Sequence, residues 1–199
     1  MEASLKYVFL LGGMDLEMSE IKSILFRQKM EFIDNDLTWG ALLSSYSSHF
    51  DNLRTFVGIE LVKDIEPPAH YVEIDHHNAN SYKESSIEQV ARLLNIDLTR
   101  YQQMVAANDR GYIPALLQYG AATDEIDFIR RADRKAQGAT MEDEVLAVRS
   151  IESNLVEVGE LIVVESLTPK FSCITDRLFP FNKLLISFKN HFVYYGEGA

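Results

Sequence analysis

The sequence is short of cysteine and of long apolar runs, and each shortage excludes a class of protein. Its one cysteine, Cys173, cannot form a disulfide within the chain, which fits a reducing compartment, so we expect a cytoplasmic protein. No apolar run approaches the roughly 18 residues that a membrane-spanning helix requires. The early run YVFLLGGM is short, lacks an A-x-A-like cleavage site and runs into DLEMSE, so it predicts a buried strand and not a signal sequence. We therefore expect no membrane partner.

Basic residues are also scarce: 19 lysines and arginines stand against 30 acidic residues, which gives a formal net charge of -11. The excess lies before residue 160, because acids and bases balance beyond it. Tight binding to long nucleic acid needs a basic face, so that partner is not expected. Carboxylates around a cleft would instead attract divalent cations, and a small phosphorylated ligand could approach once the cations were bound.

The first half of the chain alternates between strand and helix patterns. Residues 6–11 predict a strand that stops at Gly12-Gly13, and Asp15 can then cap a helix. The connector between the expected strands at 55–62 and 69–75 is too short for a crossover helix. It predicts either a tight turn or two strands that are not paired directly in parallel. Further elements are expected at 32–33 (strand), 39–50 (helix), 87–94 (helix) and 99–107 (helix, with a positive φ at Gly111 beyond it).

The second half of the chain contains a helical pattern followed by a strand-rich pattern. Two charged amphipathic helices are expected at 124–137 and 141–155, and the stretch from Glu160 onward, FSCIT (171–175) included, reads as strand-rich. The fold class expected is α/β, with a doubly wound, mostly parallel sheet flanked by helices. We divide the chain into a catalytic α/β domain (1–122), a helical linker (123–158) and a partial or diverged β-rich C-terminal part (159–199).

Chemistry-bearing residues stand where these strands end. Parallel α/β sheets place their sites beyond the carboxyl ends of the strands. Imidazole and carboxylate together suit a first-row metal ion such as manganese, and without cysteine ligands a structural zinc site is disfavoured. Two such ions could activate water for phosphoester hydrolysis. The residues concerned are Asp15 and Glu17 after the first strand, Glu60 late in the strand at 55–62, Asp75-His76-His77 after the next strand, and Asp109 at a helix end.

The segment IDHH after a strand resembles the signature of the DHH phosphoesterase superfamily, whose members are manganese-dependent hydrolases of phosphodiester or phosphoanhydride bonds. In that family a D-x-D motif follows the first strand, an aspartate ends a middle strand, DHH follows, and another aspartate comes after a helical pair. This order agrees over roughly residues 5–120. The resemblance implies two Mn²⁺ ions (Mg²⁺ as the alternative) held by Asp15, Glu17, Glu60, Asp75, His76 and Asp109, with Asp75 and His77 catalytic and His77 and Asn78 binding substrate.

The sequence also departs from the family pattern. No histidine precedes Asp15, glutamates stand at 17 and 60 where the family has aspartates, and the glycine-rich GGGH-like motif of the second domain is missing. A second reading is therefore a catalytically degenerate DHH domain that binds a metal or a nucleotide as a regulatory module. The substrate and the oligomeric state stay open. The basic run Arg130, Arg131, Arg134 and Lys135 is expected to form a solvated helix face paired with Asp124, Asp127 and Asp133.

Overall fold

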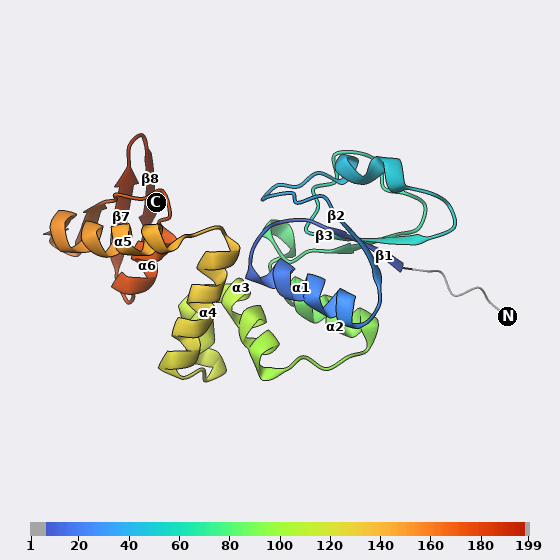
Figure 1. Cartoon of the computed structure of the whole chain (residues 1–199), viewed down its shortest axis with the longest axis horizontal. Coiled ribbons are helices and arrows are strands. Elements are labelled where there is room, and N and C mark those ends of the chain that lie inside the picture. Colours follow the sequence, from blue (N-terminus) through green and yellow to red (C-terminus); the bar gives the residue numbers. More distant parts are fainter. Residues whose placement is uncertain (1–6, 198–199) are drawn as a thin grey trace. The chain divides into compact units, whose positions relative to one another are not determined.

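The structure of the chain is a computed structural model that describes residues 7–197 and divides into two compact units (Figure 1). The first unit spans Met1–Ala136 and the second Gln137–Ala199. The boundary between them falls inside the helical segment 123–158. Each unit has its own sheet, and each is described by itself.

The first unit is built on a four-stranded parallel sheet with the strand order β2-β1-β3-β4. The expected α/β fold is therefore confirmed. β3 and β4 pair directly in parallel, with Phe56 opposite Tyr71, so both alternatives predicted for their connector are wrong. The connector is an irregular loop, and Val62 pairs with the segment before η1 through hydrogen bonds to Ala41 and Leu43. The strands are β1 (Tyr7–Leu11), β2 (Glu31–Asp34), β3 (Thr55–Ile59) and β4 (Tyr71–Ile74).

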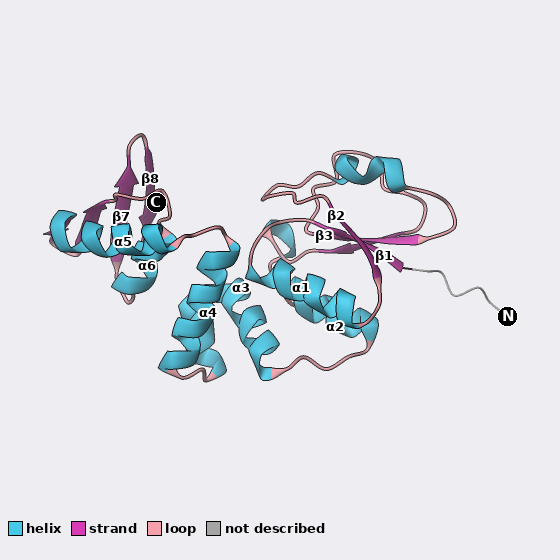
Figure 2. Cartoon of the chain, viewed as in Figure 1, coloured by secondary structure: helices cyan, strands magenta, loops and turns pink. Residues whose placement is uncertain are grey.

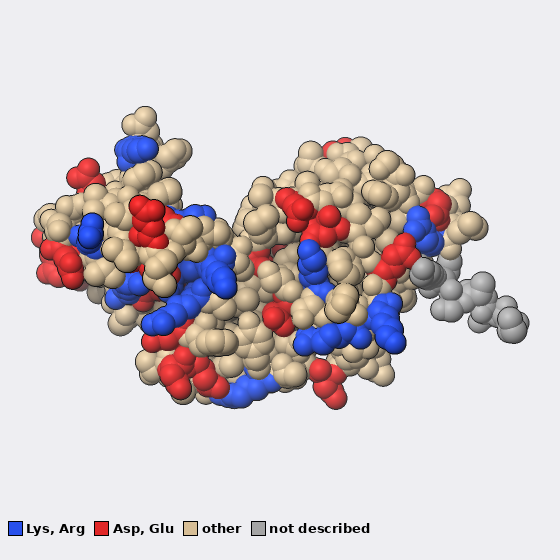
Figure 3. All heavy atoms as spheres, viewed as in Figure 1, with Lys and Arg blue, Asp and Glu red and all other residues tan. Residues whose placement is uncertain are grey.

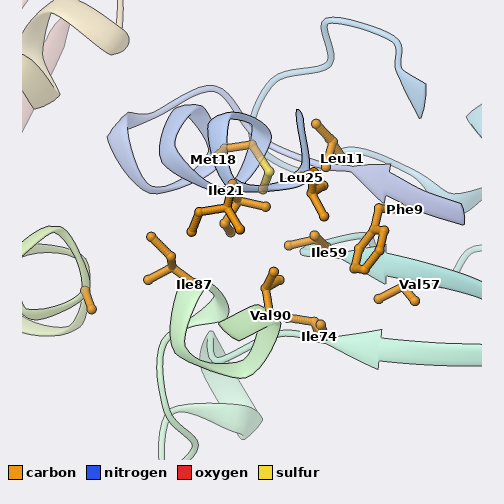
Figure 4. Close-up of a cluster of buried hydrophobic side chains, with 12 residues drawn as sticks. Phe9, Leu11, Met18, Ile21, Leu25, Val57, Ile59, Ile74, Ile87 and Val90 are labelled. Carbon is orange, nitrogen blue, oxygen red and sulfur yellow. The ribbon is translucent and has the colours of Figure 1, made fainter. Parts of the chain in front are cut away.

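The two faces of this sheet are covered by different kinds of element, because alternate side chains along each strand point to opposite faces. Phe9 and Leu11 pack with helices α1 (Leu16–Arg27) and α2 (Ser86–Leu94), as Figure 4 shows. Val8 and Leu10 pack instead with η1 (Leu43–His49). η1 is a short 3₁₀ helix that lies inside the range 39–50 where the sequence predicts a helix. Its serines favour local hydrogen bonds over an α-helix, and its buried Tyr46 donates a hydrogen bond to the carbonyl of Leu11.

Two further helices complete the first unit, α3 (Arg100–Tyr119) and α4 (Thr123–Ala136) (Figure 2). α3 continues well past the predicted end near Ala107, with a kink at Gly111 and Tyr112. The positive φ expected at Gly111 belongs to Tyr112, at 60°, while Gly111 is extended at -167°. The expectation was wrong for the residue: Tyr112 takes the positive φ, and its ring lies against the guanidinium of Arg130, 4.5 Å from the ring centre, a tertiary contact that the sequence pattern does not reveal.

The second unit packs two helices on a mixed four-stranded sheet of order β5-β6-β7-β8. β6 and β7 run parallel, and the outer pairs are antiparallel. FSCIT lies largely in helix α6 and not in a strand, because Cys173 and Ile174 are adjacent and both buried in the core of this unit, a pattern that strand alternation does not give. The elements are α5 (Met141–Asn154), β5 (Leu155–Val158), β6 (Leu161–Glu165), α6 (Ser172–Leu178), β7 (Lys183–Phe188) and β8 (His191–Tyr195).

Acidic and basic side chains are interspersed on the face of each unit that is in view in Figure 3. Within residues 7–197, no helix combines the length and the apolar character needed to cross a bilayer.

Candidate metal centre

The candidate site lies where the strand order reverses. The chain places β2 on one side of β1 and β3 on the other, and α/β sheets bind ligands at such a switch point, beyond the carboxyl ends of the strands. Asp15 follows β1, Glu60 follows β3, and His76 and His77 follow β4. Gly12 lets the first two segments approach closely, since a Cβ there would lie 2.5 Å from the carbonyl oxygens of both Ile59 and Glu60.

Three side chains form the centre of the site: Glu17 and His76, which are buried, and Asp109, which is partly buried. Nε2 of His76 lies 2.6 Å from Oδ2 of Asp109 and 3.5 Å from Oε2 of Glu17. Within the part of the chain that the structure describes, none of these three atoms has a hydrogen-bond partner of acceptable geometry. Buried polar atoms are normally satisfied. Two carboxylate oxygens and one imidazole nitrogen that meet at one point are ligand types that a divalent metal ion accepts, so these three residues are a candidate metal-binding group.

Glu17 is held by the helix that follows the DHH segment. Its Oε1 accepts a hydrogen bond from the backbone N–H of Ile87 at 3.0 Å, in the first turn of α2. A carboxylate is favoured at a helix N-terminus, where backbone N–H groups are free. One oxygen of Glu17 therefore fixes the side chain, and the other points at His76 and Asp109.

A second group of possible ligands adjoins the first and consists of Glu60, His76 and His77. Oε1 of Glu60 lies 3.5 Å from Nε2 of His77 and 3.8 Å from Nε2 of His76. Glu60 stands one residue beyond β3 with a φ of 54°, so it does not lie within the strand as the sequence predicts. A non-glycine residue in this left-handed region is uncommon, and such residues cluster at functional sites.

The protonation of the cluster follows from its burial and from its excess of carboxylates. Burial, followed by the charge of Glu60, raises the pKa of Asp15 to about 7. Burial also raises the pKa of Glu17. For His76, burial opposes the charged form, but the nearby carboxylates of Asp109 and Glu17 outweigh it and raise the pKa to about 10. Without a metal, protons reduce the repulsion among these acids.

Three other predicted site residues lie outside both groups. Asp15 caps α1 through a 2.8 Å hydrogen bond from the backbone N–H of Met18, and is buried near Glu60. Asp75 accepts hydrogen bonds from the backbone N–H of His77 at 3.0 Å and from Nδ2 of Asn80 at 2.8 Å, so it holds the turn that carries His77. Asn78 has a φ of 51° and lines an adjacent pocket.

A buried arginine lies behind the cluster, and the sequence did not predict it. Arg130 donates to Oδ1 of Asn108 at 2.8 Å and to Oδ2 of Asp133 at 2.7 Å. The charge of Asp133 also helps to raise the pKa of Asp15. The expected solvated face is therefore wrong for Arg130 and Arg134, both of which are buried. The reason is tertiary: α4 packs this face against α3, a contact that helical periodicity alone does not reveal.

Comparison with known proteins adds little to this geometry. No family profile and no curated protein matches the chain. Among solved structures, a pGpG-specific phosphodiesterase, PggH from Vibrio cholerae, is similar to it at 13% sequence identity with a TM-score of 0.47. The match covers 96% of this chain and 81% of that one. A likeness this distant assigns no function to the chain.

Proposed function

We propose that the chain is a metal-dependent phosphoesterase of the DHH type, which hydrolyses a phosphodiester or phosphoanhydride bond in a small nucleotide or short oligonucleotide. The observation that carries the proposal is the meeting of Oε2 of Glu17, Nε2 of His76 and Oδ2 of Asp109, all buried and unsatisfied. The motif order of the sequence and the position at the switch point support it.

The ligand atoms fit manganese better than the other common ions. The two groups offer carboxylate oxygens and imidazole nitrogens, and the one cysteine of the chain lies in the second unit. Calcium takes oxygen ligands almost entirely, and structural zinc sites favour cysteine. We therefore propose Mn²⁺, with Mg²⁺ as the alternative. A bound ion of this kind would lower the pKa of a coordinated water and make hydroxide available near neutral pH.

The side chains around the ion would have different roles in metal binding, substrate binding and positioning. Glu17, His76 and Asp109 would hold it, and Glu60 would join them from the side of His77. His77 is partly exposed, and the hydrogen bond with Glu60 raises its pKa, so its protonated ring could bind a phosphate oxygen of the substrate. Asp75 would keep His77 in place through the backbone hydrogen bond of the turn. Asp15 would add negative charge beside Glu60.

One observation favours the second candidate, a regulatory module that binds a single ion. Nε2 of His76 is the atom that approaches the acids of both groups. One imidazole nitrogen can bind only one ion, so a second ion would have to depend on Glu60, His77 and Asp15. The sequence also favours a single ion, because it has glutamates at 17 and 60 and lacks a histidine before Asp15.

Elemental analysis of the purified protein, combined with a substrate panel, separates the two candidates. The panel contains oligoribonucleotides, a phosphoadenosine phosphate, cyclic dinucleotides and polyphosphate, each with added Mn²⁺. Two bound ions with hydrolysis support the enzyme, whereas one ion without hydrolysis supports the module. Protein that binds no ion would contradict the enzyme and leave only a module that binds a nucleotide.

Three histidine variants test the roles of the two imidazoles. His76→Ala should abolish both metal binding and turnover. His77→Ala should abolish turnover but leave most of the metal bound. His191→Ala is the matched control, because His191 is exposed on β8 in the second unit. Turnover that survives His77→Ala would contradict the role proposed for His77.

A further inference from the structure

A row of three rings leads from the candidate metal centre to the surface. The rings of His76 and His77 lie 4.2 Å apart between centroids, and the ring of Trp39 lies 5.7 Å beyond His77. Exposure increases along the row: His76 is buried, His77 partly exposed and Trp39 71% exposed. Trp39 stands in the loop between β2 and η1 and is the only tryptophan of the chain. Exposure alone does not single out Trp39, since Phe26 and Tyr82 are more exposed, but Trp39 is the exposed ring that lies against His77.

Trp39 forms one wall of a pocket of about 260 Å³ that also reaches Glu60 and His77. The pocket is therefore continuous with the candidate metal site. Ligand pockets usually measure roughly 300–1,000 Å³, so this one has room for a single ring system and not for a whole dinucleotide. Other residues that line it are Lys63, Glu73, Asp75 and Asn78.

The charge of the pocket decides which part of a nucleotide it can accept. Glu60, Glu73 and Asp75 contribute carboxylates, and the ammonium of Lys63 is already paired with Glu73 at 2.8 Å. A phosphate group would be repelled here. A flat uncharged ring would not, and its amino or imino hydrogens could donate to these carboxylates. Stacking on an aromatic face is the usual way in which proteins hold a base.

We propose that this pocket binds one nucleobase of the substrate, stacked on Trp39, while the scissile phosphate lies at the metal centre. The inference rests on the proposed function and narrows it: the substrate is a nucleotide and not inorganic polyphosphate. Trp39 then determines the specificity for substrates that carry a base. The neighbouring His77 ring lies between the base and the phosphate and positions them relative to each other.

Because Trp39 is the only tryptophan, its fluorescence reports directly on the pocket. With Mn²⁺ present, adenosine and guanosine 5′-monophosphates should quench the emission in a saturable way. Ribose 5-phosphate, which carries the phosphate without the base, should not. N-acetyltryptophanamide corrects for collisional quenching. Equal quenching by ribose 5-phosphate, or none by either nucleotide, would overturn the proposal.

Kinetics provide the second test. The substrates are a dinucleotide and its analogue with tetrahydrofuran in place of each base. Trp39→Leu should lower the preference in kcat/KM for the dinucleotide over this analogue by about five- to 150-fold, the range expected for one stacked base. Trp39→Phe should retain most of the preference. Phe26→Leu, a matched change at a residue that is 76% exposed on α1, should leave the preference unchanged.

The outcomes separate this inference from the function on which it rests. Hydrolysis with an unchanged preference in Trp39→Leu overturns the base pocket alone. Equal loss on both substrates also overturns it, because Trp39 would then act through His77. Saturable nucleotide quenching without any hydrolysis supports the base pocket and contradicts the enzyme.

Discussion

Replacement of Asp15 by asparagine separates the electrostatic from the structural role of this side chain. Asp15 is buried, and its Oδ1 caps α1 by accepting the backbone N–H of Met18 at 2.8 Å. Asparagine presents an oxygen at the same distance from the backbone and caps helices about as well as aspartate. Asp15→Asn therefore removes the charge and retains the cap.

The pKa of Asp15 sets the size of the expected effect. Burial, then the charge of Glu60, raises it from 3.8 to about 7, so the folded protein holds this proton more tightly than the unfolded chain does. The metal-free protein should therefore lose stability as the pH rises from about 4 to about 7. At about 1.36 kcal/mol for each pKa unit, the ionisation of Asp15 costs on the order of 4 kcal/mol at pH 8 and about 1.6 kcal/mol at pH 5. The asparagine variant avoids both costs.

Urea unfolding of wild type and Asp15→Asn, in the presence of a chelator, measures this difference. The variant should be more stable at both pH values, and its advantage should be larger at pH 8 than at pH 5 by about 2 to 3 kcal/mol. Saturating Mn²⁺ should remove or reverse the advantage, because the cation then offsets the charge. An advantage that is equal at pH 5 and pH 8 would refute the reasoning. Asp51→Asn is the control: this partly exposed carboxylate accepts the backbone N–H of Leu53 and pairs with Arg54, its pKa is lowered, and its removal should give no gain at pH 8.

Four further predictions follow from the same geometry. Gly12→Ala should cost about 1–3 kcal/mol in urea unfolding and also weaken Mn²⁺ binding, because the new Cβ would meet the Glu60 backbone. Gly58→Ala, whose Cβ would meet the hydroxyl of Tyr71, should destabilise the protein similarly but leave the Mn²⁺ affinity within a few-fold. Titration calorimetry in buffers of different ionisation enthalpy should show proton release on Mn²⁺ binding at pH 7, with affinity rising with pH, because the pKa of His76 is raised to about 10 in the metal-free protein. Glu17→Asp should weaken Mn²⁺ binding at least tenfold by the same calorimetry, and an affinity equal to wild type would contradict the role assigned to Glu17.

The position of the site could be predicted from the sequence because parallel strands share a direction. Once residues 7–11, 55–59 and 71–74 are strands of one parallel sheet, whatever follows them stands at the same edge. This rule places Glu60 and His76 at one edge, and the direct parallel pairing of β3 with β4, which the sequence did not predict, makes them neighbours. The α/β class follows in the same way from the alternation of strand and helix patterns.

Other parts of the site depend on contacts between segments far apart in the sequence. Arg130 reads as one charge of a solvated helix face, and only the packing of α4 on α3 buries it against Asn108. The positive φ falls on Tyr112 instead of its glycine neighbour, and the Tyr112 ring lies against Arg130 of another helix. Trp39 lies in a stretch that resembles a helix, and its contact with His77 joins loops at two strand ends. Local propensity contains none of this information.

The same long-range contacts give a physical reason for the glutamates that depart from the DHH pattern. Glu17 has two partners in different directions: the backbone N–H of Ile87 at 3.0 Å and Nε2 of His76 at 3.5 Å. Aspartate at this position would be one methylene too short to serve both. Glu60 starts beyond the end of β3, on a turn with a φ of 54°, and its longer side chain still comes within 3.8 Å of Nε2 of His76. Both glutamates therefore come near the imidazole of His76, and the substitutions that weaken the family resemblance in the sequence are compatible with the candidate metal centre.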